Sequence, residues 1–183
     1  MRYHEYLSCA EKHLKGCSSL LQSYTPDSVH DMYVWMELYY LSGYIIEGIT
    51  VYSAYKLYGW QNNCDIMQCY DSVFTQNTGL DFYYHRTAGV NFNNRNHPAV
   101  SLGVEKHHFQ AIAKNLLRVD PSFNDVPYLG GGAIDLDVEQ LIDSWRPNIR
   151  YKYIGTHIPF PHLSQDLIAR LLSTCLTIYL KHI

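Results

Sequence analysis

Glu47 is the residue whose type and position most directly demand a chemical explanation. It stands inside a run, residues 38–60, in which nearly every side chain is apolar. Burying an isolated carboxylate among apolar groups costs many kcal/mol, so we expect Glu47 to be paired with a cation. Arg150 is the predicted partner, because a guanidinium can hold a carboxylate through two hydrogen bonds. Such a pair either lines a polar cleft or joins two parts of the core without doing chemistry.

Two other patterns are typical of ligand sites, but the surrounding residues argue against both. The chain has 5 cysteines, an odd number, and Cys64 and Cys69 have four residues between them where zinc sites more often have two. We therefore expect free thiols and no metal. Three glycines at 130–132 precede a helix start, as in phosphate-binding loops, but Asp135 and Asp137 follow and would repel phosphate.

Length, composition and charge limit the class of protein. The 183 residues correspond to about one domain, so we expect a single domain over 1–183. With 47% apolar and 17% charged residues, the chain is not disordered as a whole. A net charge of −3 excludes a histone-like or polybasic role. The first residues mix charges of both signs and contain no apolar core of a secretory signal, so a cytoplasmic location is expected.

Helical periodicity and capping signals predict the elements that position Glu47. Six apolar residues from Tyr3 to Leu21, spaced 4-3-4-3-4, predict an amphipathic helix over about 2–23. Ser28, followed three residues later by Asp31, resembles a capping box. A second helix is therefore expected to begin there and to end near residue 59.

This second helix is predicted to be the central element of the fold. Its small residues, Gly43 and Gly48 among them, weaken an isolated helix and so indicate places where neighbouring helices come close. Its apolar run is long enough to span a membrane, but Glu47 and Lys56 would each cost about 2.5–3.5 kcal/mol there. A helix buried inside its own protein is the better interpretation, and no membrane association is expected.

The remainder of the chain predicts an irregular insertion and three further helices. Residues 60–105 are rich in Asn, Gly and aromatic side chains without a sustained period, and long irregular insertions of this kind are functional or mobile. Helical spacing returns at 107–120, Asp137 is a plausible N-cap of a short fourth helix, and 163–183 predicts a fifth. The predicted fold is an all-α bundle of five helices.

Three motifs, taken in order, resemble the HEPN (higher eukaryotes and prokaryotes nucleotide-binding) domain. They are Tyr40-Leu-Ser-Gly43-Tyr-Ile-Ile-Glu47 in the second helix, Lys106-His107-His108-Phe109 opening the third, and Arg150-Tyr151 before the last. The resemblance implies a HEPN-like five-helix bundle, often dimeric, with a polar cleft. The binding residues that it implies here are Tyr40, Glu47, His107, His108, Arg150 and Tyr151. His107 also stands where a helix N-cap belongs, which is its structural interpretation.

One branch of the family cleaves RNA without a metal, using an Arg followed after four to six residues by a His. Arg150 and His157 have this spacing, so the resemblance implies that they would act as phosphate clamp and as general base or acid. However, Gly155 and Pro159 indicate that residues 150–157 are not helical, in which case the two side chains need not converge.

Three functions therefore remain open. The first is a non-catalytic HEPN-like module that binds a nucleotide, RNA or a protein partner, in a toxin–antitoxin or nucleotidyltransferase-associated context. The second is a metal-independent endoribonuclease toxin that uses Arg150 and His157. The third is an assembly protein whose 17 tyrosines form an interaction surface. The first fits the motifs best. It requires no cofactor, and the expected partners are a second copy of the chain and a nucleotidyltransferase-like protein.

Overall fold

The computed structural model describes residues 2–27, 30–57, 135–151 and 163–183, with short pieces at 80–81, 102–103, 109–110 and 112–113. Within these residues there are four α-helices and one 3₁₀ helix: α1 (His4–Ser23), α2 (Asp31–Leu57), α5 (Leu136–Ser144), η4 (Pro147–Tyr151) and α6 (Gln165–Leu180). The strands β1 (Leu80–Asp81) and β2 (Leu102–Gly103) pair in parallel, with Leu80 opposite Leu102. The described part is mostly helical, as predicted.

The predicted helices at the two ends of the chain are confirmed, whereas the middle of the chain is described only in part. α1, α2 and α6 occupy the segments that periodicity assigned to the first, second and fifth helices. The predicted third helix and the insertion at 60–105 fall mostly outside the described residues. The pieces at 109–110 and 112–113 are helical, and Phe109, Ile112 and Ala113 are buried as the apolar spacing requires.

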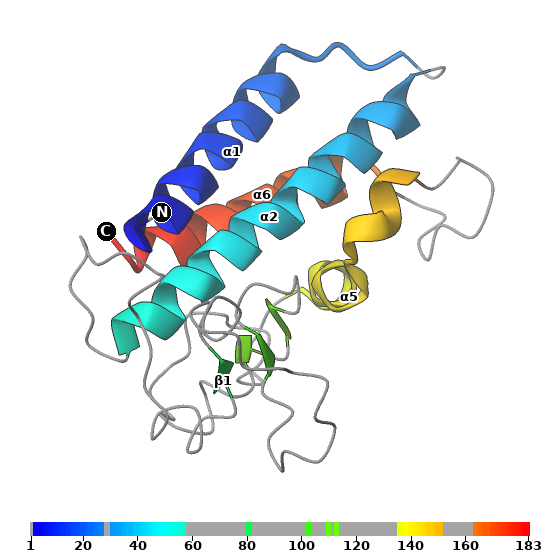
Figure 1. The fold of residues 1–183 in the computed structure, drawn as a ribbon. Helices are drawn as coiled ribbons and strands as arrows, with labels where there is room; N and C mark the ends of the chain where they lie inside the picture. The colour runs from blue at the N-terminus through cyan, green and yellow to red at the C-terminus, as the bar shows by residue number, and fades with distance from the viewer. Residues whose placement is uncertain are drawn as a thin grey trace.

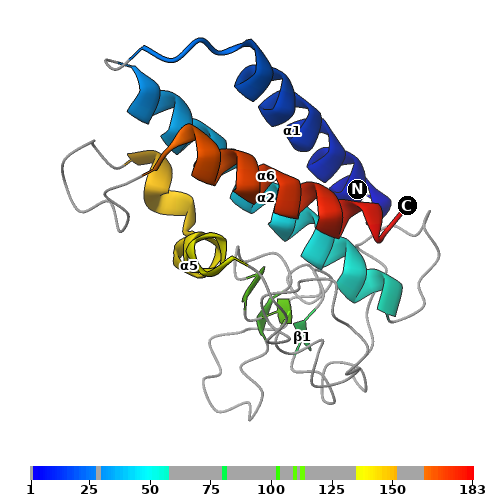
Figure 2. The ribbon, with the colours of Figure 1, turned by 180° about the vertical axis from the view of Figure 1, so that it is seen from behind.

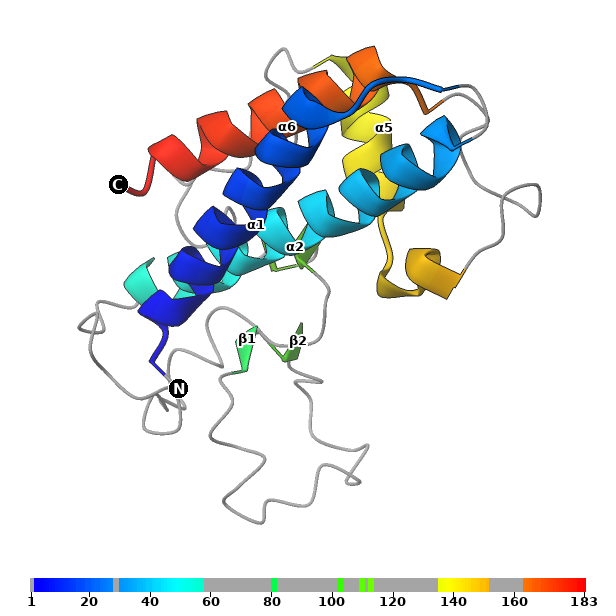
Figure 3. The same cartoon turned by 90° about the horizontal axis from the view of Figure 1, so that it is seen from above.

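α1, α2 and α6 pack against one another and form the core of the bundle. α1 runs antiparallel to α2, and α6 lies behind α2 in Figure 1. α5 is seen end-on in the same view, so that its axis crosses that of α2. β1 and β2 lie on the side of α2 away from α6 (Figure 3). α2 is therefore the element that the other parts of the fold surround.

The burial of α2 explains its nearly uninterrupted apolar sequence. Ile45 and Ile49 are both 0% exposed, and the residues from Ile45 to Tyr55 are all buried. A helix that is covered on all sides needs no polar face, so its sequence loses the usual amphipathic pattern. The prediction of a central buried helix is confirmed. Within the described residues, no helix is both long enough and apolar enough to cross a lipid bilayer.

Two glycines of α2 mark close approaches, as the sequence predicted. A Cβ atom placed on Gly48 would lie 2.8 Å from the backbone oxygen of Tyr6 in α1. A Cβ atom on Gly43 would overlap the indole ring of Trp145, which follows α5. Because real Cβ atoms do not come this close to other atoms, only glycine lets α1 and Trp145 reach the backbone of α2.

The helix caps correct one prediction, for α5, and leave the predicted Ser28 cap of α2 untested. The N-cap of α5 is Asp135, whose carboxylate accepts the backbone N–H of Asp137, so the assignment of Asp137 as the cap was wrong. Before α2, Asp27 accepts the N–H of His30 at 2.8 Å, whereas Ser28 lies outside the described residues. Ser164 caps α6 by accepting the N–H of Leu167. The Asp135 and Ser164 caps each satisfy a helical N–H that has no partner within its own helix.

Both ends of the chain pack on the last turns of α2. The ring of Tyr52 lies 5.6 Å from that of Tyr3, which precedes α1, and 5.8 Å from that of His182, which follows α6. His182 also lies 3.3 Å from the hydroxyl of Ser53 through Nε2. Figure 2 shows the ends of α1 and α6 at this part of α2. These contacts fix the orientation of α2 relative to its two neighbours.

Candidate binding site on helix α2

Tyr40, Tyr44 and Glu47 lie along one face of α2. Residues four and seven positions apart on a helix are rotated by only about 40° and 20° from one another, so the three side chains follow one line. The hydroxyls of Tyr40 and Tyr44 are 2.9 Å apart, and their rings meet edge to face at 5.0 Å. Both tyrosines are half-buried. The structure therefore places a phenol pair on the same face of α2 as Glu47, which follows Tyr44 by about one turn.

Glu47 is buried, as the sequence predicted. It is only 8% exposed, and its neighbours Ile46 and Gly48 are buried too. A carboxylate in this position must be stabilised by hydrogen bonds or by a cation, since water does not reach it freely. Burial of Glu47 is the part of the sequence hypothesis that the structure confirms.

Trp145 connects the α2 face to the segment that carries the predicted arginine. It is 1% exposed, its indole N–H donates to the backbone oxygen of Tyr40 at 3.0 Å, and its ring meets that of Tyr44 at 5.3 Å. Gln110 donates to the backbone oxygen of Ile142 at 2.9 Å, which ties the 109–113 piece to the end of α5. Through these contacts Trp145 links α2 to the residues that follow α5.

Directly after Trp145, η4 packs against α2 and carries further residues of the predicted site. The backbone of Arg150 lies in this 3₁₀ helix, while its side chain is outside the described part of the structure. Tyr151 is 70% exposed, and Arg146 is exposed while its guanidinium donates to the backbone oxygen of Asp143 at 2.9 Å. η4 and the residue before it therefore bring an exposed aromatic ring and two arginine positions to the α2 side of the bundle.

The structure brings together some of the predicted site residues and leaves the others undescribed. Tyr40 and Glu47 share one face of α2, and Arg150 and Tyr151 belong to η4, which contacts α2. The Glu47–Arg150 pair stays a prediction, because the arginine side chain is not described. The remaining predicted residues, His107, His108 and His157, lie outside the described residues. The geometry of the Arg150–His157 pair is therefore untested.

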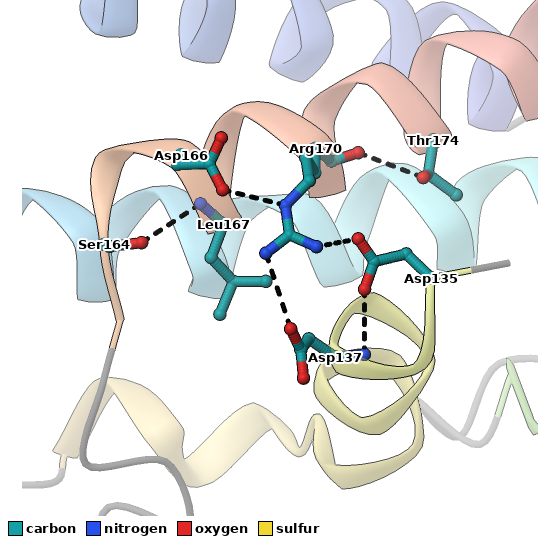
Figure 4. Close-up of polar contacts among 7 residues, drawn as sticks. All are labelled: Asp135, Asp137, Ser164, Asp166, Leu167, Arg170 and Thr174. Atoms are coloured by element: carbon teal, nitrogen blue, oxygen red, sulfur yellow. Dashed lines mark hydrogen bonds and ion pairs between the residues drawn. The ribbon is translucent and has the colours of Figure 1, made fainter.

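A cluster around Arg170 was missed by the sequence analysis. Its guanidinium contacts Asp166 at 3.0 Å within α6, Asp137 at 3.5 Å, and Asp135 at the start of α5 (Figure 4). The four-residue spacing of Asp166 and Arg170 on a helix could have predicted their ion pair from the sequence. The contacts of Arg170 with Asp135 and Asp137 could not be predicted from the sequence, because they depend on how α5 packs against α6. Arg170 is 38% exposed, so we interpret the cluster as a surface link between helices.

The three cysteines in the described part of the structure are free thiols. Cys9 is exposed and free, and Cys17 and Cys175 are buried and free. Burial raises the pKa of the Cys17 thiol to about 11, with a smaller contribution from Glu37, so this thiol is unreactive near neutral pH. Cys64 and Cys69 lie outside the described residues. Among the residues that are described, no group of three His, Cys, Asp or Glu side chains is arranged to hold a metal ion.

The surroundings of two further ionisable groups, His13 and Tyr39, shift their pKa values. Burial lowers the pKa of His13, and the neighbouring charge of Lys12 lowers it further. The ring of His13 lies 6.3 Å from that of Tyr44, on the α1 side of the tyrosine. Burial raises the pKa of Tyr39, whose hydroxyl donates to the backbone oxygen of Leu141 at 2.7 Å. Both groups are therefore neutral at physiological pH, and Tyr39 adds a second hydrogen bond between α2 and α5.

Comparison of the chain with protein-family models, with curated proteins and with solved structures found no match in any of the three.

Proposed function

We propose that this protein is a HEPN-like helical module that binds a nucleotide, free or within RNA, without cleaving it. The proposed site is formed by the Tyr40–Tyr44–Glu47 face of α2 and by η4. The proposal joins the resemblance of the motifs to HEPN domains with the arrangement of the side chains in this region. It includes the expectation that a nucleotidyltransferase-like protein is a functional partner.

The observation that supports the proposal is the contact of η4 with α2, together with the packing of Trp145, shortly before η4, on Tyr44. Tyr151 offers a ring that is 70% exposed, and an aromatic ring can stack on any nucleobase. Arg146 and Arg150 supply positive charge within five positions of Tyr151, suited to a phosphate group. The hydroxyls of Tyr40 and Tyr44, on the same face of α2 as Glu47, can donate to and accept from the edge of a base. Stacking, a cation and hydrogen-bonding groups together are what nucleotide recognition requires.

The test is equilibrium binding of fluorescent adenine and guanine nucleotides and of a short single-stranded RNA, measured by fluorescence polarisation. Base stacking on an aromatic ring contributes about 1–3 kcal/mol, so Tyr151→Ala should weaken binding by roughly 5- to 150-fold. Tyr33→Ala is the matched control, because Tyr33 is also a surface tyrosine, 63% exposed, at the start of α2. Its affinity should equal that of the unmodified protein.

The binding proposal fails if neither nucleotide nor RNA binds at protein concentrations up to about 1 mM, the range of very weak complexes. It also fails if Tyr151→Ala and Tyr33→Ala weaken binding equally. The RNA samples, incubated with a chelator, separately test the endoribonuclease alternative. Cleavage products that disappear in the Arg150→Ala and His157→Ala variants would replace binding by metal-independent catalysis.

A further inference from the structure

His13 of α1 lies against the ring of Tyr44, which belongs to the proposed binding face of α2. The two ring centroids are 6.3 Å apart, and the rings are tilted by 32°. His13 is half-buried. Among the described residues, neither nitrogen of its ring has a hydrogen-bond partner. The imidazole therefore borders the site and keeps hydrogen-bonding groups that a ligand can use.

The tyrosine face of α2 points between α1 and the residue that follows α5. Gly43 faces Trp145, and Gly48 faces α1. Successive residues of a helix are rotated by about 100°, so these two directions are about 140° apart. Tyr40 and Tyr44 point between them, at about 60° and 100° from Gly43. Figure 1 shows the same arrangement, with α1 and α5 on opposite sides of α2 and α6 behind it. A ligand on this face is therefore bordered by α1 as well as by Trp145.

The surroundings of His13 favour a neutral imidazole. Burial lowers the pKa of His13, and the charge of Lys12 lowers it further. A neutral imidazole offers one N–H donor and one acceptor, whereas the protonated ring offers two donors and a positive charge. The edges of nucleobases carry both donors and acceptors, whereas a phosphate group is bound best by a cation. The neutral ring is therefore suited to the base of a nucleotide and not to its phosphate.

We infer that His13 is a further binding residue of the proposed site, where its imidazole forms a hydrogen bond with the edge of the nucleotide's base. The inference rests on the proposed function, because it requires a nucleotide on the Tyr40–Tyr44–Glu47 face of α2. It gives α1 a direct part in binding, in addition to α2 and η4. Recognition of the base then involves α1, whereas the phosphate is left to Arg146 and Arg150.

The first test is the affinity of the His13→Phe variant for fluorescent adenine and guanine nucleotides, measured by fluorescence polarisation. Phenylalanine keeps an aromatic ring beside Tyr44 but has neither nitrogen. Loss of one neutral hydrogen bond should weaken binding by roughly 2- to 13-fold. His30→Phe is the matched control, because His30 is an exposed histidine about 20 Å from Tyr44 along the axis of α2. Its affinity should equal that of the unmodified protein, and circular dichroism checks that both variants are folded.

The second test uses the unmodified protein and does not depend on the folding of a variant. The ring signals of His13 and His30 are followed by nuclear magnetic resonance while AMP or GMP is added. The His13 signal should shift and reach saturation at the nucleotide concentration that saturates binding. The His30 signal should not move.

The outcomes separate this inference from the proposed function. Unmodified affinity in a folded His13→Phe variant would overturn the inference, and so would a His13 signal that does not move at saturating nucleotide. The proposed function would stand in both cases if Tyr151→Ala still weakened binding. Failure of the unmodified protein to bind any nucleotide would overturn both.

Discussion

Replacement of Gly43 by alanine is predicted to destabilise the protein by pushing Trp145 out of its place. The added Cβ atom would lie 1.9–2.3 Å from three atoms of the indole ring, a full overlap of atoms. Trp145 is 1% exposed and its ring also meets those of Tyr44 and Phe109, so it cannot turn aside without disturbing other contacts. The indole must therefore leave α2.

Three contributions set the size of the effect. Overpacking of a core typically costs about 1–3 kcal/mol. Loss of the Trp145–Tyr40 hydrogen bond adds about 0.5–1.5 kcal/mol. The higher helix propensity of alanine offsets these losses by about 1 kcal/mol. Because the overlap is severe, we expect a net loss of about 2–3 kcal/mol in the free energy of unfolding. That corresponds to a fall of roughly 4–12 °C in Tm for a chain of this size.

Gly16→Ala provides a matched control in the same protein. Gly16 lies inside α1, is exposed, and an added Cβ atom there would have no atom within 4 Å. The same substitution should therefore raise the free energy of unfolding by about 0.5–1 kcal/mol. Urea denaturation measures both variants. If Gly43→Ala stabilised the protein as Gly16→Ala does, the packing of Trp145 on α2 would be refuted.

Two further predictions concern α6 and the buried thiols. Arg170→Ala should lower the free energy of unfolding by about 1–2 kcal/mol at low salt and by less in 1 M salt, since its exposed ion pairs are screened; a loss independent of salt would argue against an electrostatic link. The pKa of Cys17 is raised to about 11 in the folded protein, so the unfolded thiol ionises first and stability is lost as pH rises from about 9 to 11. In urea denaturation, Cys17→Ala should reduce this alkaline loss by up to about 2 kcal/mol, whereas Cys9→Ser, at an exposed thiol, should leave it unchanged. An undiminished alkaline loss in Cys17→Ala would show that this thiol does not contribute.

The helices were predictable because their signals are local. The apolar spacing of α1, the continuous apolar run of α2 and the segment after Pro161 each define a helix without reference to the rest of the chain. The α5 cap was assigned to the wrong residue because Asp135 and Asp137 are both good capping residues. Only the backbone conformation at Asp135 decides between them.

Contacts between distant segments could be predicted only in part. Gly43 indicated a close approach, but nothing in the sequence identified Trp145 as the neighbour, since 102 positions separate them. Glu47 was different, because a carboxylate in an apolar helix has to be buried and stabilised, and its burial is confirmed. The Arg170 cluster shows the limit of this reasoning: a surface arginine has many possible acidic partners, and the packing of α5 on α6 selects among them.

The pairing of Glu47 with Arg150 is the central claim, and a double-mutant cycle on the free energy of unfolding tests it most directly. Breaking a buried ion pair by removing one partner costs about 3–5 kcal/mol, so Glu47→Gln and Arg150→Met should each destabilise the protein by that order. The double variant should lose less than the sum of the two, with a coupling of about 2 kcal/mol or more. Strictly additive losses, with Arg150→Met close to neutral, would contradict the pairing and with it the polar cleft assigned to Glu47 and Arg150.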